Sequence, residues 1–95
     1  MDEIIAVKCL ILNKLVRSNI WGGKHIPIDF IIKSLPEHIR IRPEGKRTIS
    51  RTLKELSNEG WIVIAKKRTG KGYDNHVSLN QEEVAEIQQF LAEHN

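Results

Sequence analysis

The sequence predicts an α+β domain that consists of four helices and one β-hairpin. Apolar residues recur at helical spacing in four segments of the chain. One further stretch, residues 61–68, is rich in β-branched and aromatic residues, and a glycine-containing turn and an alternating stretch follow it. The length of 95 residues corresponds to a single domain, residues 1–95.

Composition narrows the functional classes further. Hydrophobic residues make up 40% and charged residues 28% of the chain, as in a soluble globular protein. The chain has neither an apolar run near the roughly 20 residues that cross a bilayer nor a secretory signal pattern. Cys9 has no cysteine partner, which favours a reducing, cytoplasmic location. A small binding module is therefore expected, and not a multidomain enzyme, a membrane protein or a disulfide scaffold.

The first predicted helix, residues 3–17, is apolar around more of its circumference than one domain face requires. Two neighbouring stripes together cover roughly 200°, against about 100° for an ordinary surface helix. Their members are Ile4, Val7, Ile11 and Leu15 in one stripe, and Ile5, Cys9, Leu12 and Val16 in the other. The second stripe must be covered by another helix or by a second subunit.

The second predicted helix, residues 27–35, begins at Pro27 and ends before Pro36, as the backbone limits of proline favour. Residues 36–45 are expected to form a polar connection in which Ile39 and Ile41 make a short extended piece. A third helix that starts earlier, near Pro43, is the alternative for the end of this connection.

The third predicted helix, residues 46–59, has two chemically different sides. A narrow core stripe contains Ile49, Leu53 and Leu56, and Gly60 is suited to end the helix. Side chains on the other side can all donate hydrogen bonds, and none is acidic: Lys46, Arg47, Ser50, Arg51, Lys54 and Asn58. Glu55 and Glu59 lie off the centre of that side.

A hairpin over residues 61–80 and a last helix over 81–93 complete the predicted elements. Ile62, Ile64, Val77 and Leu79 are expected on the core face of the hairpin. Cations and one aromatic residue gather at its tip: Lys66, Lys67, Arg68, Lys71 and Tyr73. Asn80 and Glu83 resemble a capping box at the start of the last helix, whose apolar side contains Val84, Ile87, Phe90 and Leu91.

Charge is distributed unevenly along the chain. Residues 40–71 contain ten Lys/Arg and three Asp/Glu, a net charge of +7, whereas residues 72–95 contain five Asp/Glu and no Lys/Arg, a net charge of −5. Residues 1–39 add +1, which gives the total of +3. A basic segment beside an acidic one suggests a polyanionic partner, although an unevenly charged solvated surface is the plain alternative.

The element order and the stretch TISRTLKELSNEGWIVIAKKR, residues 48–68, resemble a winged helix-turn-helix domain of MarR, ArsR and related prokaryotic regulators, archaeal ones included. The resemblance implies a three-helix core, a two- or three-stranded hairpin wing and an additional C-terminal helix. It also implies binding of double-stranded DNA by a dimeric transcriptional regulator. The ten-residue connection 36–45 departs from the usual turn of three to four residues.

The residues themselves support nucleic-acid binding. A major groove about 12 Å wide admits one helix, and an arginine can pair with a guanine edge. Arg47 and Arg51, four residues apart, project together. The expected recognition residues are Lys46, Arg47, Thr48, Ser50, Arg51, Lys54 and Asn58; those of the wing are Lys66, Lys67, Arg68, Lys71 and Tyr73; Arg40 and Arg42 could touch phosphates. An ordinary solvated helix face is the alternative.

No catalytic, cofactor or metal motif is found in the sequence. Gly45-Lys46 does not belong to a phosphate-binding loop, because positions 40 and 47 are both arginine. The spacings typical of metal ligands are missing among His25, His38, His76, His94 and Cys9. We therefore expect no enzymatic activity, no cofactor, no metal and no small-molecule ligand.

The apolar first and last helices suggest a homodimer. Its expected interface contains Ile5, Leu12, Val16, Ile87, Phe90 and Leu91. Such a dimer would place two third helices about 34 Å apart on one duplex, while packing of the last helix on the first within one chain is the alternative.

Two other functions stay open: a protein-interaction winged helix in a transcription or replication assembly, and binding of RNA or single strands, which the aromatic content of 5% disfavours.

Overall fold

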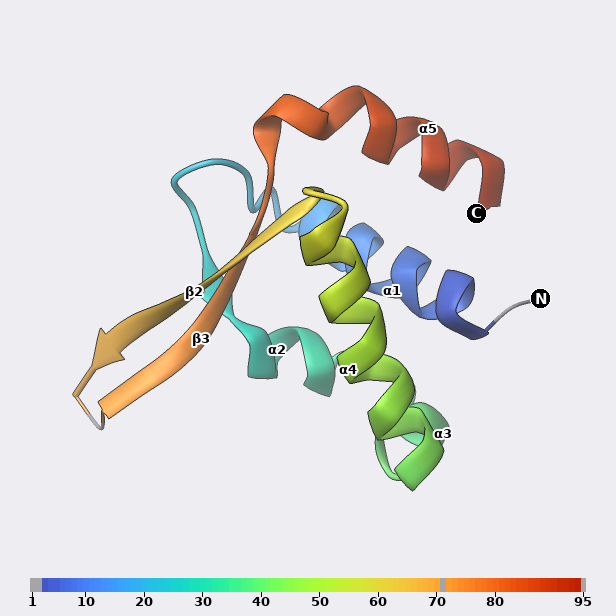
Figure 1. Ribbon diagram of the computed structural model, residues 1–95, viewed down its shortest axis with the longest axis horizontal. Helices are drawn as coiled ribbons and strands as arrows, with labels where there is room; N and C mark the ends of the chain where they lie inside the picture. The colour runs from blue at the N-terminus through green and yellow to red at the C-terminus, as the bar shows by residue number, and fades with distance from the viewer. Residues whose placement is uncertain (1–2, 71, 95) are drawn as a thin grey trace.

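The computed structural model describes residues 3–70 and 72–94, and within them the chain folds as α+β, as predicted (Figure 1). Five α-helices and three strands alternate in the order helix, strand, three helices, hairpin, helix. In chain order the elements are α1 (Glu3–Arg17), β1 (Ile26–Pro27), α2 (Ile28–Lys33), α3 (Glu37–Arg40), α4 (Pro43–Asn58), β2 (Ile62–Thr69), β3 (Gly72–Leu79), a 3-10 turn η1 (Gln81–Glu83) and α5 (Val84–His94).

The strands form one antiparallel sheet in the order β1-β3-β2. The long hairpin β2–β3 pairs from Ile62 with Leu79 down to Thr69 with Gly72. The short strand β1 pairs with β3 through Ile26 and Val77, which makes the sheet three-stranded. The hairpin projects away from the helices, while α5 lies at the side remote from its tip (Figure 1).

The helix α1 lies at the centre of the core and contacts α2, α4, α5 and β3. Val7, Ile11 and Leu15 of its first apolar stripe are completely buried. The second stripe faces α5, since the Cys9 Sγ lies 3.9 Å from the carbonyl oxygen of His94. The excess apolar surface of this helix is therefore covered within one chain.

This packing bears on the residues that the sequence assigned to a dimer. Leu12 and Ile87 are completely buried and Leu91 is nearly so, which means that they serve the core of the single chain. Ile5, Val16 and Phe90 are half-buried and pack at the edge of the same core. Self-association is not needed to cover α1, and it stays a prediction.

The connection between the second and third predicted helices differs from the expectation. The expected extended piece at Ile39 and Ile41 is wrong, because residues 37–40 form the helix α3 and Ile41 caps it in a helical conformation. Ile39 is buried, as a core residue of this helix, whereas Ile41 is exposed. The helix α4 begins at Pro43 and not at residue 46, which agrees with the earlier start considered above.

The close approach of α3 to α4 depends on Gly45. A Cβ atom on this residue would lie 1.8 Å from the carbonyl oxygen of Ile39. Only a residue without a side chain lets the backbone of one helix rest on the first turn of the other. Gly45 therefore fixes how the start of α4 is held against α3.

The junctions around the hairpin follow the sequence prediction, except that the Asn80 side chain caps the Glu82 amide and not the Glu83 amide that a capping box requires. Gly60 has φ 79° and follows the last turn of α4, as expected of a helix-ending glycine. Asn80 accepts a hydrogen bond from the Glu82 amide at 3.1 Å and donates one to the Gly60 carbonyl at 2.7 Å. The residue thus caps η1 and ties both ends of the hairpin together. The helix predicted over 81–93 consists of η1 followed by α5.

Candidate nucleic-acid interface

Six exposed side chains of α4 that can donate hydrogen bonds form what we call the donor face: Lys46, Arg47, Ser50, Arg51, Lys54 and Asn58. The opposite side of the helix is buried through Gly45, Ile49, Thr52, Leu53 and Leu56. Thr52 is fully buried and donates its hydroxyl hydrogen to the carbonyl oxygen of Thr48 at 2.7 Å. The predicted division of this helix into a core side and a solvent side is therefore confirmed.

Thr48 is separated from the other predicted recognition residues. It is half-buried, and its hydroxyl donates to the Glu44 carbonyl at 2.9 Å. At 100° per residue its position falls on the edge of α4 that also contains Glu44 and Glu55. The hydroxyl of Thr48 is thus engaged by its own helix and points away from the donor face.

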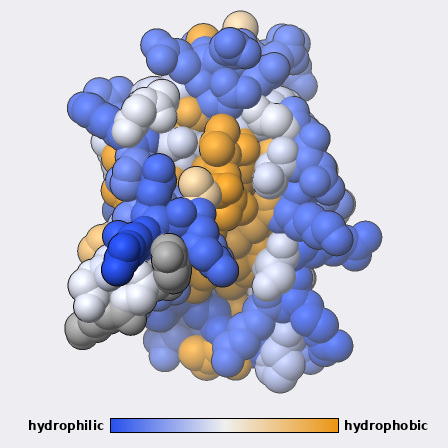
Figure 2. Space-filling model, turned by 60° about the vertical axis from the view of Figure 1, so that its left-hand side comes forward, coloured by the Kyte–Doolittle hydropathy of each residue, from blue (hydrophilic) through white to orange (hydrophobic). Residues whose placement is uncertain are grey.

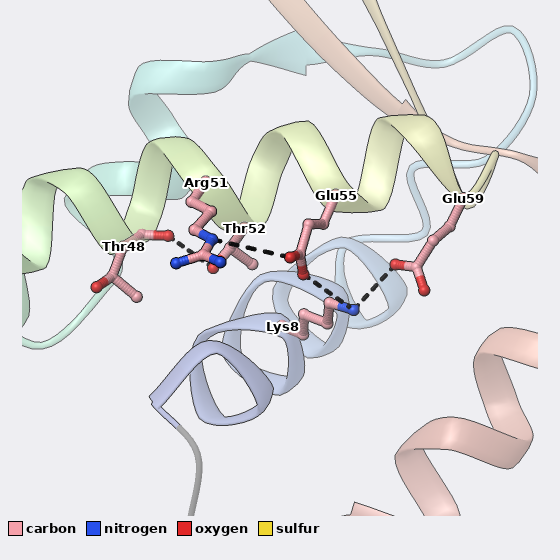
Figure 3. A network of polar contacts seen from close by, with 6 residues as sticks. All are labelled: Lys8, Thr48, Arg51, Thr52, Glu55 and Glu59. Atoms are coloured by element: carbon pink, nitrogen blue, oxygen red, sulfur yellow. Dashed lines mark hydrogen bonds and ion pairs between the residues drawn. The ribbon is translucent and has the colours of Figure 1, made fainter.

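An acidic edge borders the donor face on the side of α1. Glu55 and Glu59 lie there, and Lys8 of α1 reaches up between them (Figure 3). The Lys8 Nζ is 3.0 Å from Glu59 Oε1 and 3.5 Å from Glu55 Oε2. Arg51 approaches the same Glu55 loosely, with 4.0 Å between Nε and Oε1. These contacts link one residue of the donor face to the body of the domain.

Hairpin cations lie on both faces of the sheet because side chains alternate along a strand. Lys66 and Arg68 share the face of Ile62 and Ile64, which is the face that packs toward the helices, and Lys67 lies on the other. All three cations are exposed. Lys71 and the side chain of Tyr73, the two other predicted hairpin contacts, lie outside what the structure describes.

A groove separates the hairpin from α4, and α2 forms its floor. A hollow of about 360 Å³ lies between α2 and the hairpin, with Ile28, Ile32 and Lys66 in its wall. A second hollow shares Ile32 and continues to Lys46 and Ser50 of α4. Figure 2, in which the hairpin side is turned forward, shows apolar surface between two hydrophilic flanks. Lys46 and Ser50 of the donor face and Lys66 of the hairpin therefore border one groove.

Two arginines precede α4. The Arg40 Nε donates to the carbonyl oxygen of Leu35 at 3.0 Å, and the residue is half-buried. This contact ties α3 to the end of α2, so part of the Arg40 guanidinium serves the fold. Arg42 is exposed at the N-cap position of α4. Of the two, Arg42 is the freer to meet an anion.

Sequence reasoning missed one pair of histidines. His25 and His76 are 51 residues apart, yet their Nδ1 atoms lie 2.6 Å from each other. The one sequence signal that could have indicated this contact is the strand β1. Its two residues are too few to show a periodic pattern. Among residues 3–70 and 72–94 no three His, Cys, Asp or Glu side chains come together as a metal site.

The remaining reactive group, the Cys9 thiol, is buried under α5. Burial disfavours its thiolate form and raises the pKa of Cys9 above its ordinary value. Because a thiol reacts through its thiolate, the residue is suited to packing and not to nucleophilic chemistry. No helix in the described part of the chain is long and apolar enough to cross a membrane.

Comparison with known proteins does not assign this chain to a family. No protein-family model matches the sequence, and a search of curated proteins finds no match. The candidate interface is therefore defined by the donor face of α4, the inner cations Lys66 and Arg68 of the hairpin, and the groove between them.

Proposed function

We propose that this chain binds double-stranded DNA as a winged helix-turn-helix domain and acts as a transcriptional regulator without catalysis. The helix α4 would enter the major groove, and the hairpin β2–β3 would be the wing. One observation carries the proposal: the six side chains of the donor face are exposed together, while Lys66 lies across a groove and Arg68 shares its face, the helix side of the sheet.

The fold supports this proposal in two ways. The order α1, β1, α2, then α4 and a hairpin, together with the strand order β1-β3-β2, is compatible with a winged helix. The donor side of α4 is also exposed along the length of the helix, as a helix that enters a DNA groove requires. The short α3 explains how a ten-residue connection fits between the two helices of the motif.

Chemistry assigns a different task to each surface. Arg47 and Arg51 are the residues suited to guanine edges, because a guanidinium can pair bidentately with them. Lys54 and the hairpin cations are suited to phosphates, whose contacts supply affinity without sequence information. Release of counterions from those phosphates would make the affinity fall as salt is raised.

Titration of a fluorescent mixed-sequence DNA duplex at several salt concentrations tests the proposal. We expect a log–log salt slope of about −0.9 per phosphate contact. Lys54→Ala should reduce its magnitude by about one contact. Thr48→Ala is the matched control, since the Thr48 hydroxyl is bound to Glu44, and it should bind as the parent does. Binding that is absent or insensitive to salt would refute the proposal.

A second function, docking of a protein partner in a transcription or replication assembly, is favoured by exposed apolar side chains. Phe30 is 62%, Ile41 63% and Val63 51% exposed. Exposed apolar side chains mark protein contacts where they form a contiguous patch. If this is the function, Phe30→Ser should abolish partner binding while Lys54→Ala leaves it intact, which is the reverse of the pattern expected for DNA.

A further inference from the structure

We infer that Lys8, a residue of α1 outside the donor face, keeps Arg51 available to DNA by holding the acidic edge of α4. This inference rests on the proposed function and adds a positioning residue to it. Lys8 is 47 positions from Glu55 in the chain, so only the packing of α1 against α4 brings the two together. Figure 3 shows the resulting chain of contacts from Arg51 through Glu55 to Lys8 and on to Glu59.

The two cations that share Glu55 are not equivalent. The Lys8 side chain is only 12% exposed and has its Nζ within 3.5 Å of Glu55 Oε2 and 3.0 Å of Glu59 Oε1. The Arg51 side chain is 71% exposed, and its Nε is 4.0 Å from Glu55 Oε1. Solvent screens the outer pair more than the inner one, so Lys8 is the stronger partner of this carboxylate.

This arrangement leaves Arg51 loosely attached and free to turn toward a duplex. When Arg51 leaves Glu55, the carboxylate still has a cation beside it, which lowers the cost of the departure. Without Lys8, Glu55 would draw Arg51 back along the helix, since the two side chains are neighbours at i,i+4 spacing. Glu59 would also lose its cation at the edge of a surface that must accept phosphates.

Lys8 would act through Glu55 and not by touching DNA. Its ammonium group is occupied by two carboxylates, and its stem is packed between α1 and α4. Loss of a direct phosphate contact would weaken binding whether or not Glu55 is charged. Loss of a positioning contact would weaken binding only while Glu55 is charged. A double-mutant cycle separates the two cases.

The experiment compares the parent with Lys8→Met, Glu55→Gln and the double variant on one mixed-sequence DNA duplex at fixed salt. Methionine retains the apolar stem of Lys8 without its charge. We expect Lys8→Met to weaken binding about fivefold and Glu55→Gln to tighten it about twofold, the scale of a partly exposed ion pair. In the Glu55→Gln background, Lys8→Met should have less than half of its effect on the logarithm of the affinity.

Lys14→Met is the matched control, because it removes the same charge from an exposed position of the same helix. It should bind as the parent does, and thermal unfolding checks that each variant is folded. If Lys8→Met proves unfolded, Glu55→Gln alone decides: unchanged or weaker binding contradicts the inference. Equal effects of Lys8→Met in both backgrounds also overturn it while the proposed function stands. A parent that fails to bind duplex overturns the proposed function, and the inference with it.

Discussion

Single residues determine how α4 is presented to solvent. Gly45 permits the backbone contact with Ile39, and Thr52 satisfies its buried hydroxyl on the carbonyl of Thr48. Both residues lie on the core side of the helix, Gly45 in its first turn and Thr52 just past its middle. The orientation of the donor face therefore depends on small residues that would not bind DNA themselves.

Gly45→Ala should destabilise the fold. A Cβ atom placed 1.8 Å from the Ile39 carbonyl oxygen forces α3 and α4 apart, and overpacking of this kind costs about 1–3 kcal/mol in the free energy of unfolding. Urea denaturation followed by circular dichroism measures the loss. Gly23→Ala is the control, since no atom lies within 4 Å of its added Cβ. Equal stability of the two variants would contradict the close contact of α3 with α4.

At this scale the sequence predicted outward positions better than partners. The donor face and the helix-ending role of Gly60 followed from periodicity and from the freedom of glycine. The link between Lys8 and Glu55 did not, because residues so far apart meet only through tertiary packing. Thr48 was assigned to the recognition residues, but its hydroxyl bonds to the Glu44 carbonyl. Local sequence alone does not decide between these two roles, because a threonine hydroxyl can bond to the backbone of its own helix.

Among the elements, those with a long periodic pattern were predicted, as was the short α2, whereas α3 and β1 were not. The helices α1, α4 and α5 and the hairpin have repeated apolar positions that indicate their type. The four residues of α3 and the two of β1 contain too few positions for any period to show. Contacts with α4 hold the proline-flanked segment of α3 in a helical turn, and contacts with β3 hold β1 extended in the sheet.

The hairpin offers a test at the level of one element. Lys66 lies on the helix side of the sheet and Lys67 on the other side, with the same charge and nearly the same place along the strand. Lys66→Ala should weaken duplex binding about two- to fivefold, as the loss of one exposed charge contact does. Lys67→Ala should weaken it less, because its side chain faces away from the groove. A larger effect of Lys67→Ala would mean that the other face of the hairpin meets DNA.

Across the whole molecule, α1 lies between α4, which has the donor face, and the acidic C-terminal helix α5. It packs against α4 on one side and α5 on another, and Leu12 is therefore completely buried. This accounts for the wide apolar arc seen in the sequence. The sequence pattern could not show whether a second subunit or α5 covers the second stripe, since both present the same kind of surface.

Ile87→Ala tests how much α5 contributes to the single-chain core. Ile87 is completely buried, and truncation of such a side chain costs about 2–5 kcal/mol in the free energy of unfolding. Val84→Ala, at a position that is 36% exposed, should change stability by only about 0.5 kcal/mol. Thermal or urea unfolding compares the two variants. Similar small losses would show that α5 is not part of the cooperative core.

We propose that the donor face of α4 and the inner side of the hairpin meet duplex DNA together. A nuclear magnetic resonance titration of isotope-labelled protein with a mixed-sequence duplex tests this residue by residue. We expect shifts at Arg47, Ser50, Lys54 and the hairpin near Lys66, with little change along α5. Shifts gathered around Phe30 and Ile41 instead, or no shifts at all, would contradict it.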